Sequence, residues 1–305
     1  MKCPHCGHGA SNQTWTLPDR LFRTTDERFD VHRCAGCGIR FLWPVPPFEQ
    51  LARYYPQGYW TGERDRATEA YRRFMLRDHA RFVRGIAARQ RANGVQPRLL
   101  DIGCGDGSVL DAIGIERSIG LDDSLGALGA LRARGFAGVR ASVLQLPFAP
   151  ATFSIVSMFH FLEHVSPAEP FLRSAQRVLA PGGSLVVQVP NMRSIQAMLL
   201  GRHWAGYDVP RHLVDYTPCH LCEAVERAGF DVVQITQKSI RDNPTTLVNS
   251  LFPSLYPPAR AQRSRLSDLT YLALVGLALP FTLLETLLGM AATVMVEARP
   301  RQSSS

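Results

Sequence analysis

Short apolar runs alternate with segments of helical periodicity through the middle of the chain. The runs cover residues 98–102, 118–122, 154–159 and 184–189, and the helix candidates between them cover 108–113, 125–134 and 166–179. Runs that are apolar on both faces are typical of strands buried under helices on either side. The pattern therefore predicts a doubly wound α/β fold around a parallel sheet.

Two further elements follow the alternating region. Thr217 and Pro218 form a helix start, and the helix runs to Ala228, directly before Gly229. Residues 230–236 form a further strand. The segment 269–288 is then apolar around its whole circumference apart from Glu285, and Pro280 interrupts it. Such a segment is either buried in protein or in contact with lipid.

Before the alternating region, residues 66–92 have the spacing of an amphipathic helix with an arginine-rich outer face, ended by Gly94 and Pro97. Its predicted apolar face consists of Tyr71, Phe74, Met75, Phe82 and Ile86. Shifts in composition divide the chain into five parts. They are a head (1–43), a linker with the amphipathic helix (44–97), a core (98–240), an apolar helical insertion (241–290), and a final core strand with a tail (291–305).

The overall composition is that of a globular protein. The chain has 305 residues, 46% of them hydrophobic, which excludes a disordered chain, a collagen-like fibre and a small disulfide scaffold. The net charge is +8, carried almost entirely by arginine, so either an anionic partner or an arginine-rich genome composition explains it. The N-terminus lacks a secretory signal, which predicts a reducing compartment where the 7 cysteines bind metal or stay as thiols.

Four of these cysteines form two knuckles in the head. Cys3 and Cys6 make one C-x-x-C-Gly pair, and Cys34 and Cys37 make the other. Four thiolates in this pattern are typical of a closed, structural zinc site in a zinc ribbon. His5, His8 and His32 lie nearby but are surplus to this set. Cys219 and Cys222 form a third C-x-x-C without a partner pair, and we interpret them as buried thiols of a helix.

A glycine-rich turn follows the first core strand. Asp101 precedes Gly103, Gly105 and Gly107, and Asp122 ends the second strand. The glycines let a ligand lie against the backbone, and the spacing differs from that of dinucleotide-binding turns. Asp101 would repel a pyrophosphate and attract an ammonium group, whereas Asp122 can accept both hydroxyls of a ribose. The turn could also be structural only.

The turn and the motifs after it resemble those of class I S-adenosylmethionine-dependent methyltransferases. The matching stretches, which occur in the family's order, are 101–107, 120–124, 146–148, 161–165 and 177–183. The resemblance implies a seven-stranded Rossmann-like sheet with an antiparallel last strand. It also implies that Asp101 and the glycines line the methionine end of the cofactor, Asp122 holds the ribose, and Ser142 and Val143 flank the adenine. Ser142 stands where the family usually has an acid.

Candidates for a catalytic base lie after the fourth core strand, at His160, Glu163 and His164. If a helix starts at His160, these side chains share one face. His160 could then act as a general base. Alternatively the three residues could bind a divalent metal, since this stretch is similar to ubiquinone-pathway O-methyltransferases with acidic and histidine ligands there. A third possibility is that Glu163 and His164 only cap and pack the helix start.

A second polar cluster occupies residues 204–216 and contains His212, our second candidate base. His212 could instead only pin its loop by a hydrogen bond. The Pro-Arg-His stretch is similar to that of methyltransferases acting in surface-polysaccharide and lipid-linked sugar pathways. Zinc-headed sugar C-methyltransferases also resemble the stretch 34–47 followed by Tyr54, Tyr55 and Tyr59.

The resemblance gives the apolar segment its expected place. Residues 292–299 look like the second strand of the family's terminal hairpin, so the segment before them starts and ends on the side of the core. This favours a bent or monotopic insertion into lipid, with a dimer interface and a single membrane span as alternatives. The flanking arginines that would meet lipid headgroups are Arg260, Arg263, Arg265, Arg299 and Arg301.

Together these features predict an enzyme that transfers methyl from S-adenosylmethionine to a hydroxyl or carbon of a sugar or lipid-linked saccharide. The predicted location is the cytoplasm, with peripheral binding to the inner face of the membrane. An RNA methyltransferase with a zinc-ribbon head is one alternative, and a non-catalytic cofactor-binding scaffold is another. No dense Lys/Arg cluster interleaved with aromatics occurs in the head, which argues against nucleic acid.

Overall fold

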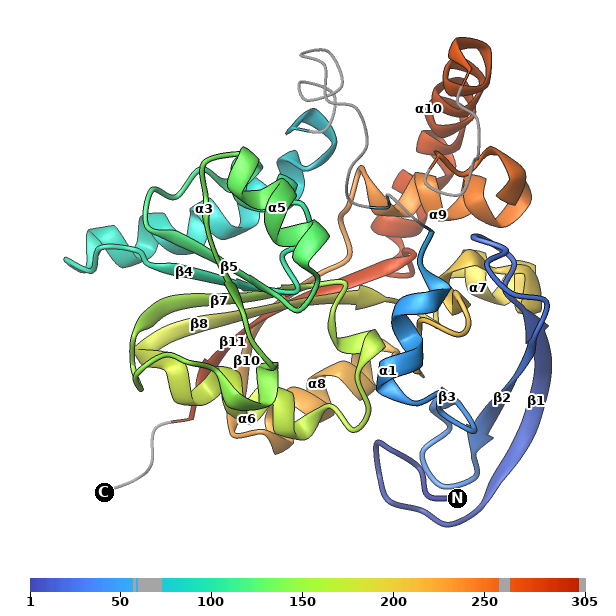
Figure 1. Ribbon diagram of the computed structural model, residues 1–305, viewed down its shortest axis with the longest axis horizontal. Coiled ribbons are helices and arrows are strands. Elements are labelled where there is room, and N and C mark those ends of the chain that lie inside the picture. Colours follow the sequence, from blue (N-terminus) through green and yellow to red (C-terminus); the bar gives the residue numbers. More distant parts are fainter. Residues whose placement is uncertain (57–58, 60–72, 258–263, 302–305) are drawn as a thin grey trace.

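The protein contains a seven-stranded core sheet and a smaller four-stranded sheet beside it (Figure 1). The computed structural model describes residues 1–56, 59, 73–257 and 264–301. The core sheet has the order β10-β11-β8-β7-β4-β5-β6. Its strands are β4 (Leu99–Ile102), β5 (Ser118–Asp122), β6 (Ala137–Arg140), β7 (Phe153–Phe159), β8 (Leu179–Pro190), β10 (Phe230–Thr236) and β11 (Thr293–Pro300).

The pairing of these strands confirms the predicted doubly wound class with an antiparallel last strand. Strands β4 to β8 pair in parallel, while β11 lies between β8 and β10 and runs antiparallel to both. Strand β6 was missed because its sequence, Ala-Gly-Val-Arg, has no apolar run, and as an edge strand it needs none.

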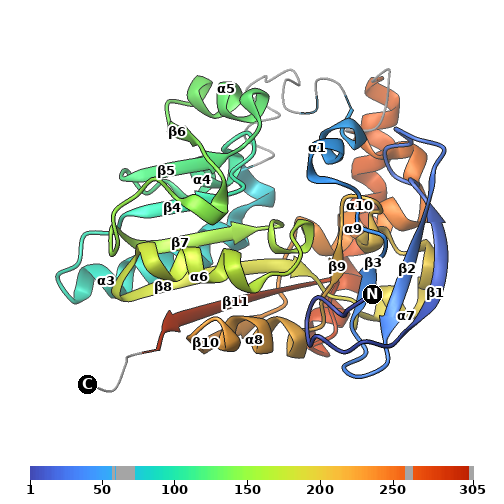
Figure 2. The same ribbon diagram turned by 60° about the horizontal axis from the view of Figure 1, so that its bottom comes forward.

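Helices cover both faces of the core sheet. The successive residues Leu99 and Leu100 point into two different apolar clusters, as the alternation of side chains along a strand requires. Residues of α3, α4 and α5 pack on one face and residues of α6 and α8 on the other (Figure 2). These helices are α3 (Arg77–Ala92), α4 (Ser108–Ile113), α5 (Leu125–Ala133), α6 (Glu169–Val178) and α8 (Pro218–Arg227).

The amphipathic helix before the core differs from its prediction at one described position. Of the predicted apolar face, Met75 and Ile86 are buried and Phe82 is half-buried, and helix α3 also buries Val83 and Ala87. Phe74, however, is 54% exposed, because its ring lies under the Arg77 guanidinium at 4.0 Å and not in the core. Tyr71 and the predicted helix start at residue 66 lie outside the described residues.

The head folds against the core and shares a sheet with it. Strands β1 (Ser11–Pro18), β2 (Arg28–Cys34) and β3 (Arg40–Leu42) are joined by β9 (Val214–Asp215), which belongs to the polar loop after β8. Phe41 pairs with Val214, and the Leu42 N–H donates to the Leu213 carbonyl at 2.9 Å. The short helix α1 (Phe48–Leu51) then leads away from the head. The head therefore helps to build the loop that carries His212.

The insertion after β10 consists of helices that lie at one end of the core (Figure 1). They are α9 (Asp242–Leu251) and the long α10 (Arg265–Leu287), and α7 (Ile195–Leu200) from the polar loop region lies beside them. Helix α10 is long and apolar enough to cross a membrane, by length and composition. Only 28% of its most apolar window is buried in the protein.

Candidate functional site

The glycine turn lies at the carboxyl end of β4 and is tied to the neighbouring strand. The N–H groups of Gly103 and Cys104 both donate to the Leu121 carbonyl, at 2.8 and 3.1 Å. Gly103 has φ +71°, and a Cβ atom on it would lie 2.7 Å from Cδ2 of Phe161. Only glycine fits this position, because any side chain would meet both backbone strain and the aromatic ring. Gly105 and Gly107 also have positive φ.

Two carboxylates border this turn. Asp101 is 2% exposed and accepts a hydrogen bond from the Ser157 hydroxyl at 2.7 Å. Asp122 accepts from the Gly105 N–H at 3.0 Å and from the Ser124 N–H at 2.9 Å. Burial raises the pKa of both, and the charge of Asp122 helps to raise the pKa of Asp101 to about 7 despite the Ser157 bond. Paired acids of this kind favour a ligand that brings positive charge.

The residues beside this turn fit the remaining parts of the predicted cofactor. Ser142 accepts a hydrogen bond from the Leu144 N–H at 3.3 Å and caps the short 3-10 helix Val143–Gln145, while the Val143 side chain is buried. Ser142 thus holds the loop at the position where the family usually has an acid. An acid for an ammonium group, an acid for a ribose and an apolar side chain together suit S-adenosylmethionine.

Asp101 predicts a pH dependence of cofactor binding. Since its pKa is raised to about 7, the carboxylate is ionised above pH 7 and takes up a proton below it. A bound cation favours the ionised form, so affinity should be highest above pH 7 and fall as the pH drops, by roughly tenfold between pH 7.5 and 5.5. Calorimetry across this range checks it. In Asp101→Asn the affinity should be weak and independent of pH.

We expect substitution of Asp122 to lower the affinity for the cofactor. Asp122→Ala removes the acceptor for the ribose. It also removes the acceptor of the Gly105 N–H, which loosens the glycine turn, so the dissociation constant of the cofactor should rise about 10- to 150-fold. Asp123→Ala is the matched control, since its side chain is exposed one residue further on. Equal affinities of the two variants would contradict the assignment of the ribose to Asp122.

The segment after β7 differs from the predicted helix start. His160 has φ +52°, and only a 3-10 turn, Leu162–His164, follows it. His160 therefore points away from His164: its Nδ1 lies 3.0 Å from Glu163, and its Nε2 lies 3.6 Å from Asp242 at the start of α9. Burial alone would lower the pKa of His160, but these two carboxylates raise it to about 9.

Glu163 and His164 instead meet His212, 48 residues further along the chain. The two imidazole rings lie 4.8 Å apart edge to face, and ligand atoms of the three residues lie within 4.8 Å of one another. His164 Nδ1 is 2.9 Å from the Arg211 carbonyl and His212 Nδ1 is 2.8 Å from the Gly206 carbonyl. A carbonyl only accepts, so both rings carry a hydrogen on Nδ1, which leaves Nε2 as the ring nitrogen for other contacts.

This cluster could perform either of two kinds of chemistry. Burial and the neighbouring His212 lower the pKa of His164 to about 4, which keeps His164 neutral. Glu163 is 1% exposed, and its Oε2 has no hydrogen-bond partner among the described residues. Two imidazoles and a carboxylate suit proton transfer from an acceptor, and they also suit a divalent metal. His160 does not belong to this candidate metal group.

The loop that carries His212 is held to the head by a buried ion network, which the sequence did not reveal. Arg211 is 2% exposed, and its guanidinium contacts Asp19 of the head and Asp208 of its own loop, each at 2.6 Å. It also donates to the Tyr54 carbonyl at 2.8 Å. The head thus positions the backbone on either side of His212.

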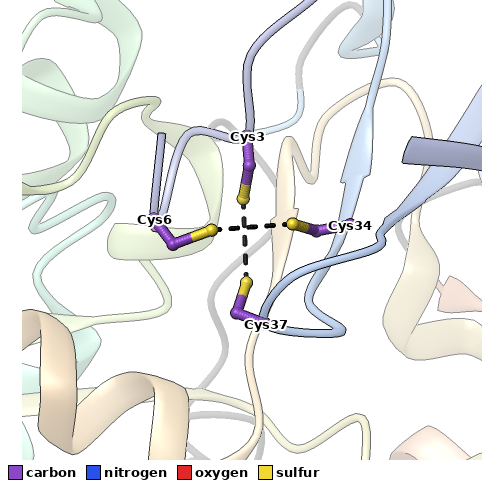
Figure 3. A group of neighbouring side chains, drawn as sticks. All are labelled: Cys3, Cys6, Cys34 and Cys37. Carbon is purple, nitrogen blue, oxygen red and sulfur yellow. Dashed lines mark hydrogen bonds between the residues drawn. The ribbon is translucent and has the colours of Figure 1, made fainter. Parts of the chain in front are cut away.

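The four head cysteines converge on one point (Figure 3). The Cys3 and Cys37 sulfur atoms lie 3.8 Å apart, and those of Cys6 and Cys34 lie 3.6 Å apart. A tetrahedron with Zn–S bonds of about 2.3 Å has sulfur atoms about 3.8 Å apart, so the group fits zinc. Burial raises the pKa of Cys34, but backbone N–H groups of Cys37 and Gly36 outweigh it and hold this pKa at about 6. Burial raises the pKa of Cys3 and of Cys37 instead, so the shift toward thiolate belongs to Cys34 and not to the whole cluster.

Histidines join this head to α8. His5 lies 2.8 Å from Glu223, and His220 Nε2 lies 3.0 Å from the Cys37 carbonyl. The interpretation of Cys219 and Cys222 as buried thiols is wrong: Cys219 is exposed and Cys222 half-buried. The reason is helical geometry, since His220, Leu221, Ala224 and Val225 occupy the buried face of α8.

We predict that the fold of the head depends on the metal that the four cysteines bind. Cys37→Ser should remove one of four ligands, and because β3 pairs with β9, the effect should reach the His212 loop. We expect about one zinc per chain in wild type by atomic absorption, little in the variant, and a lower melting temperature. Cys219→Ser is the control, since this cysteine is exposed outside the cluster. A metal-free wild type of equal stability would contradict the zinc assignment.

Comparison with known proteins decides the family. The family described as "Methyltransferase domain" matches residues 70–235. The chain belongs to this methyltransferase family. The match covers the glycine turn, Asp122 and the segment of His160 to His212, so the predicted methyltransferase family is confirmed.

Individual relatives of this methyltransferase agree with the family. A probable S-adenosylmethionine-dependent methyltransferase of Mycolicibacterium smegmatis is 30% identical over 179 residues, which are 56% of this chain and 65% of that protein. A ubiquinone biosynthesis O-methyltransferase of Rhizobium rhizogenes is 28% identical over 235 residues, 70% of this chain and 86% of that protein. A solved methyltransferase of Thermotoga maritima, titled a possible histamine N-methyltransferase, has a TM-score of 0.46 at 18% identity, covering 77% of this chain and 96% of that one.

Proposed function

We propose that this methyltransferase transfers a methyl group from S-adenosylmethionine to a hydroxyl or carbon of a sugar or lipid-linked saccharide. The observation that carries the proposal is the position of two clusters at one edge of the sheet. Phe161 packs on Gly103 of the cofactor turn, and the next residues lead to Glu163 and His164, which meet His212. A donor held at the turn therefore lies beside groups that can accept a proton.

In this proposal each residue has a defined role. Asp101 and the glycines hold the methionine end of the donor, Asp122 holds its ribose, and Val143 lies against its adenine beside Ser142. The donor supplies an activated methyl group with a good leaving group, so the protein mainly has to orient the acceptor and remove its proton.

We assign the removal of the proton to His212. Its Nδ1–H donates to the Gly206 carbonyl, which fixes the ring and leaves Nε2 as the atom that can take the proton. Glu163 is ionised, since the hydrogen bond from His160 lowers its pKa against the effect of burial, and it can stabilise an imidazolium on His212. His160 itself is held as a cation between Glu163 and Asp242, so its role is to position Glu163 rather than to act as a base.

The named relatives favour a second class of acceptor. Several of them are called ubiquinone biosynthesis O-methyltransferases, which suggests a ring hydroxyl on a quinone precursor in place of a saccharide. For a hydroxyl acceptor of either class, the proposed role of His212 as the proton acceptor is the same.

Transfer of a labelled methyl group tests the function and separates the acceptors. Purified protein with methyl-labelled donor is incubated with cell membranes, with soluble saccharides and with total RNA, each beside the Asp122→Ala and His212→Ala variants. We expect label in the membrane lipid extract, in a saccharide-bearing species, and little with either variant. Label in a quinone fraction would support the second acceptor class, and label in RNA would overturn both. Cofactor binding without any transfer would indicate a scaffold.

A further inference from the structure

One face of helix α10 is buried against the rest of the protein. Tyr271, Val275 and Ala278 are buried against α9 in a small apolar cluster of their own. The Tyr271 hydroxyl is hydrogen-bonded to Asn249 of α9 at 3.0 Å. The spacing of four and three residues places this buried stripe on one side of the helix.

The opposite face of α10 is apolar and exposed. An ordinary surface helix carries polar residues there, whereas this one carries leucines. Leu266 is 76% exposed, Leu277 is 77% exposed and Leu287 is 84% exposed. We call the exposed leucines of this helix and its C-cap the leucine face: Leu266, Leu269, Leu272, Leu277, Leu283, Leu284, Leu287 and Leu288.

Neighbouring helices extend this apolar character at the same end of the molecule (Figures 1 and 2). Helix α7 exposes Met198 and Leu199, and the end of α9 exposes Leu251 and Phe252. Together with the leucine face they make up more than half of the large apolar side chains that are exposed among the described residues. A concentration of this size marks an interaction surface.

The charges around the leucine face favour an anionic lipid surface over a second copy of the chain. The described segments of this end, 191–207, 237–256 and 264–291, contain Arg193, Arg202, Lys238, Arg241 and Arg265. Arg241 pairs with Asp242 at 3.0 Å and Lys238 lies 4.0 Å from Asp78, so the positive charge for headgroups comes from Arg193, Arg202 and Arg265. Two of the three acids in these segments, Asp242 and Glu285, are buried, which leaves Asp268 as the acid nearer the surface. Two copies meeting here would bring like charges together, whereas anionic headgroups would be attracted. The flanking Arg260 and Arg263 of the sequence prediction lie outside the described residues.

The packing of α10 indicates that the helix lies along the membrane instead of crossing it. Near its end, the Glu285 carboxylate accepts hydrogen bonds from the Gln196 backbone N–H at 2.8 Å and from its side-chain amide at 2.7 Å, both in α7. Strand β11 begins at Thr293 inside the core sheet. A spanning orientation would strip these contacts and draw α9 into the hydrocarbon region, where its polar groups would be costly.

We propose that α10 is a monotopic membrane-docking helix whose leucine face enters the acyl boundary of an anionic bilayer while the arginines contact headgroups. Helix α9 connects this surface to the candidate site, because Asp242 at its start lies 3.6 Å from His160. If the proposed function holds, docking places the site next to a membrane-linked acceptor. The docking itself does not depend on that function.

Vesicle flotation of the full-length protein tests the proposal. Vesicles of phosphatidylcholine with a phosphatidylglycerol fraction are compared with vesicles of phosphatidylcholine alone, in low and high salt. We expect binding to the anionic vesicles that salt weakens but does not abolish. Leu269→Gln, Leu277→Gln and Leu287→Gln in one variant should lower binding at least about tenfold, since three exposed leucines lose their insertion into lipid.

The matched control replaces Val233 and Ile235, which are 49% and 48% exposed on the edge strand β10, by threonine. It should bind vesicles like wild type. Light scattering and cofactor calorimetry accompany every variant, so that a folding defect or a failure of the proposed function is seen separately. No binding of a folded wild type to either vesicle overturns the proposal. A dimer that the leucine substitutions dissolve would assign the face to a second copy and overturn it as well.

Discussion

Replacing His212 by alanine is expected to lower turnover by about 100- to 10,000-fold, the range of a lost general base. The affinity for the cofactor should stay unchanged, because Asp101 and Asp122 lie at the ends of β4 and β5 and are not hydrogen-bonded to His212. Single-turnover transfer of labelled methyl and calorimetry with the donor measure the two quantities independently.

The control for this variant is His203→Ala. His203 lies nine residues before His212 in the same loop region, and its side chain is exposed. Its removal should leave turnover near the wild-type value. A His212→Ala variant as active as His203→Ala would contradict the assignment of the base. Equal losses of turnover and cofactor affinity would show instead that His212 only holds its loop.

Replacing Arg211 by methionine should destabilise the fold by about 3–5 kcal/mol, because it leaves the carboxylates of Asp19 and Asp208 buried without their partner. In wild type, burial raises the pKa of Asp19, but the hydrogen bonds and charge of Arg211 outweigh this and lower it. The loss therefore applies at neutral pH, where Asp19 is ionised, and should shrink as the pH falls and Asp19 becomes protonated. Urea unfolding at two pH values measures it.

Arg173→Met is the matched control for charge and size. Arg173 pairs with Glu169 at 2.7 Å, but both side chains are about half exposed. A surface pair of this kind contributes less than about 1 kcal/mol. If Arg211→Met cost no more than Arg173→Met, the ion network would not hold the head to the His212 loop, and the head would have to be positioned by β3, β9 and the zinc site alone.

The cofactor end of the site could be predicted because its residues act through local backbone. Asp101 and Asp122 end neighbouring parallel strands, and such strands present their carboxyl ends at one edge. The glycine turn joins them directly, since the Gly105 N–H donates to Asp122. The convergence of the four head cysteines could be predicted for a similar reason, because each knuckle is a local turn and a four-cysteine group needs only two such turns.

The interactions of the candidate catalytic residues could not be predicted in the same way. His160 and Glu163 do interact as their spacing suggests, but Asp242 reaches His160 from 82 residues away and turns it into a cation. No local pattern marks Asp242, which lies in the insertion. Likewise Asp208 lies three residues before Arg211, but the second partner of Arg211, Asp19, is 192 residues distant and no local pattern links it to Arg211.

The sequence by itself determined the parallel sheet, the cofactor turn and the cysteine cluster, since hydrophobic period, glycine and the spacing of thiols act over a few residues. Only the tertiary structure decided which histidine is neutral and which is charged, that the head holds the His212 loop, and that α10 leaves its leucines uncovered. These properties depend on burial and on charges brought together from distant segments, and the electrostatic energy of a side chain is set by its neighbours in space.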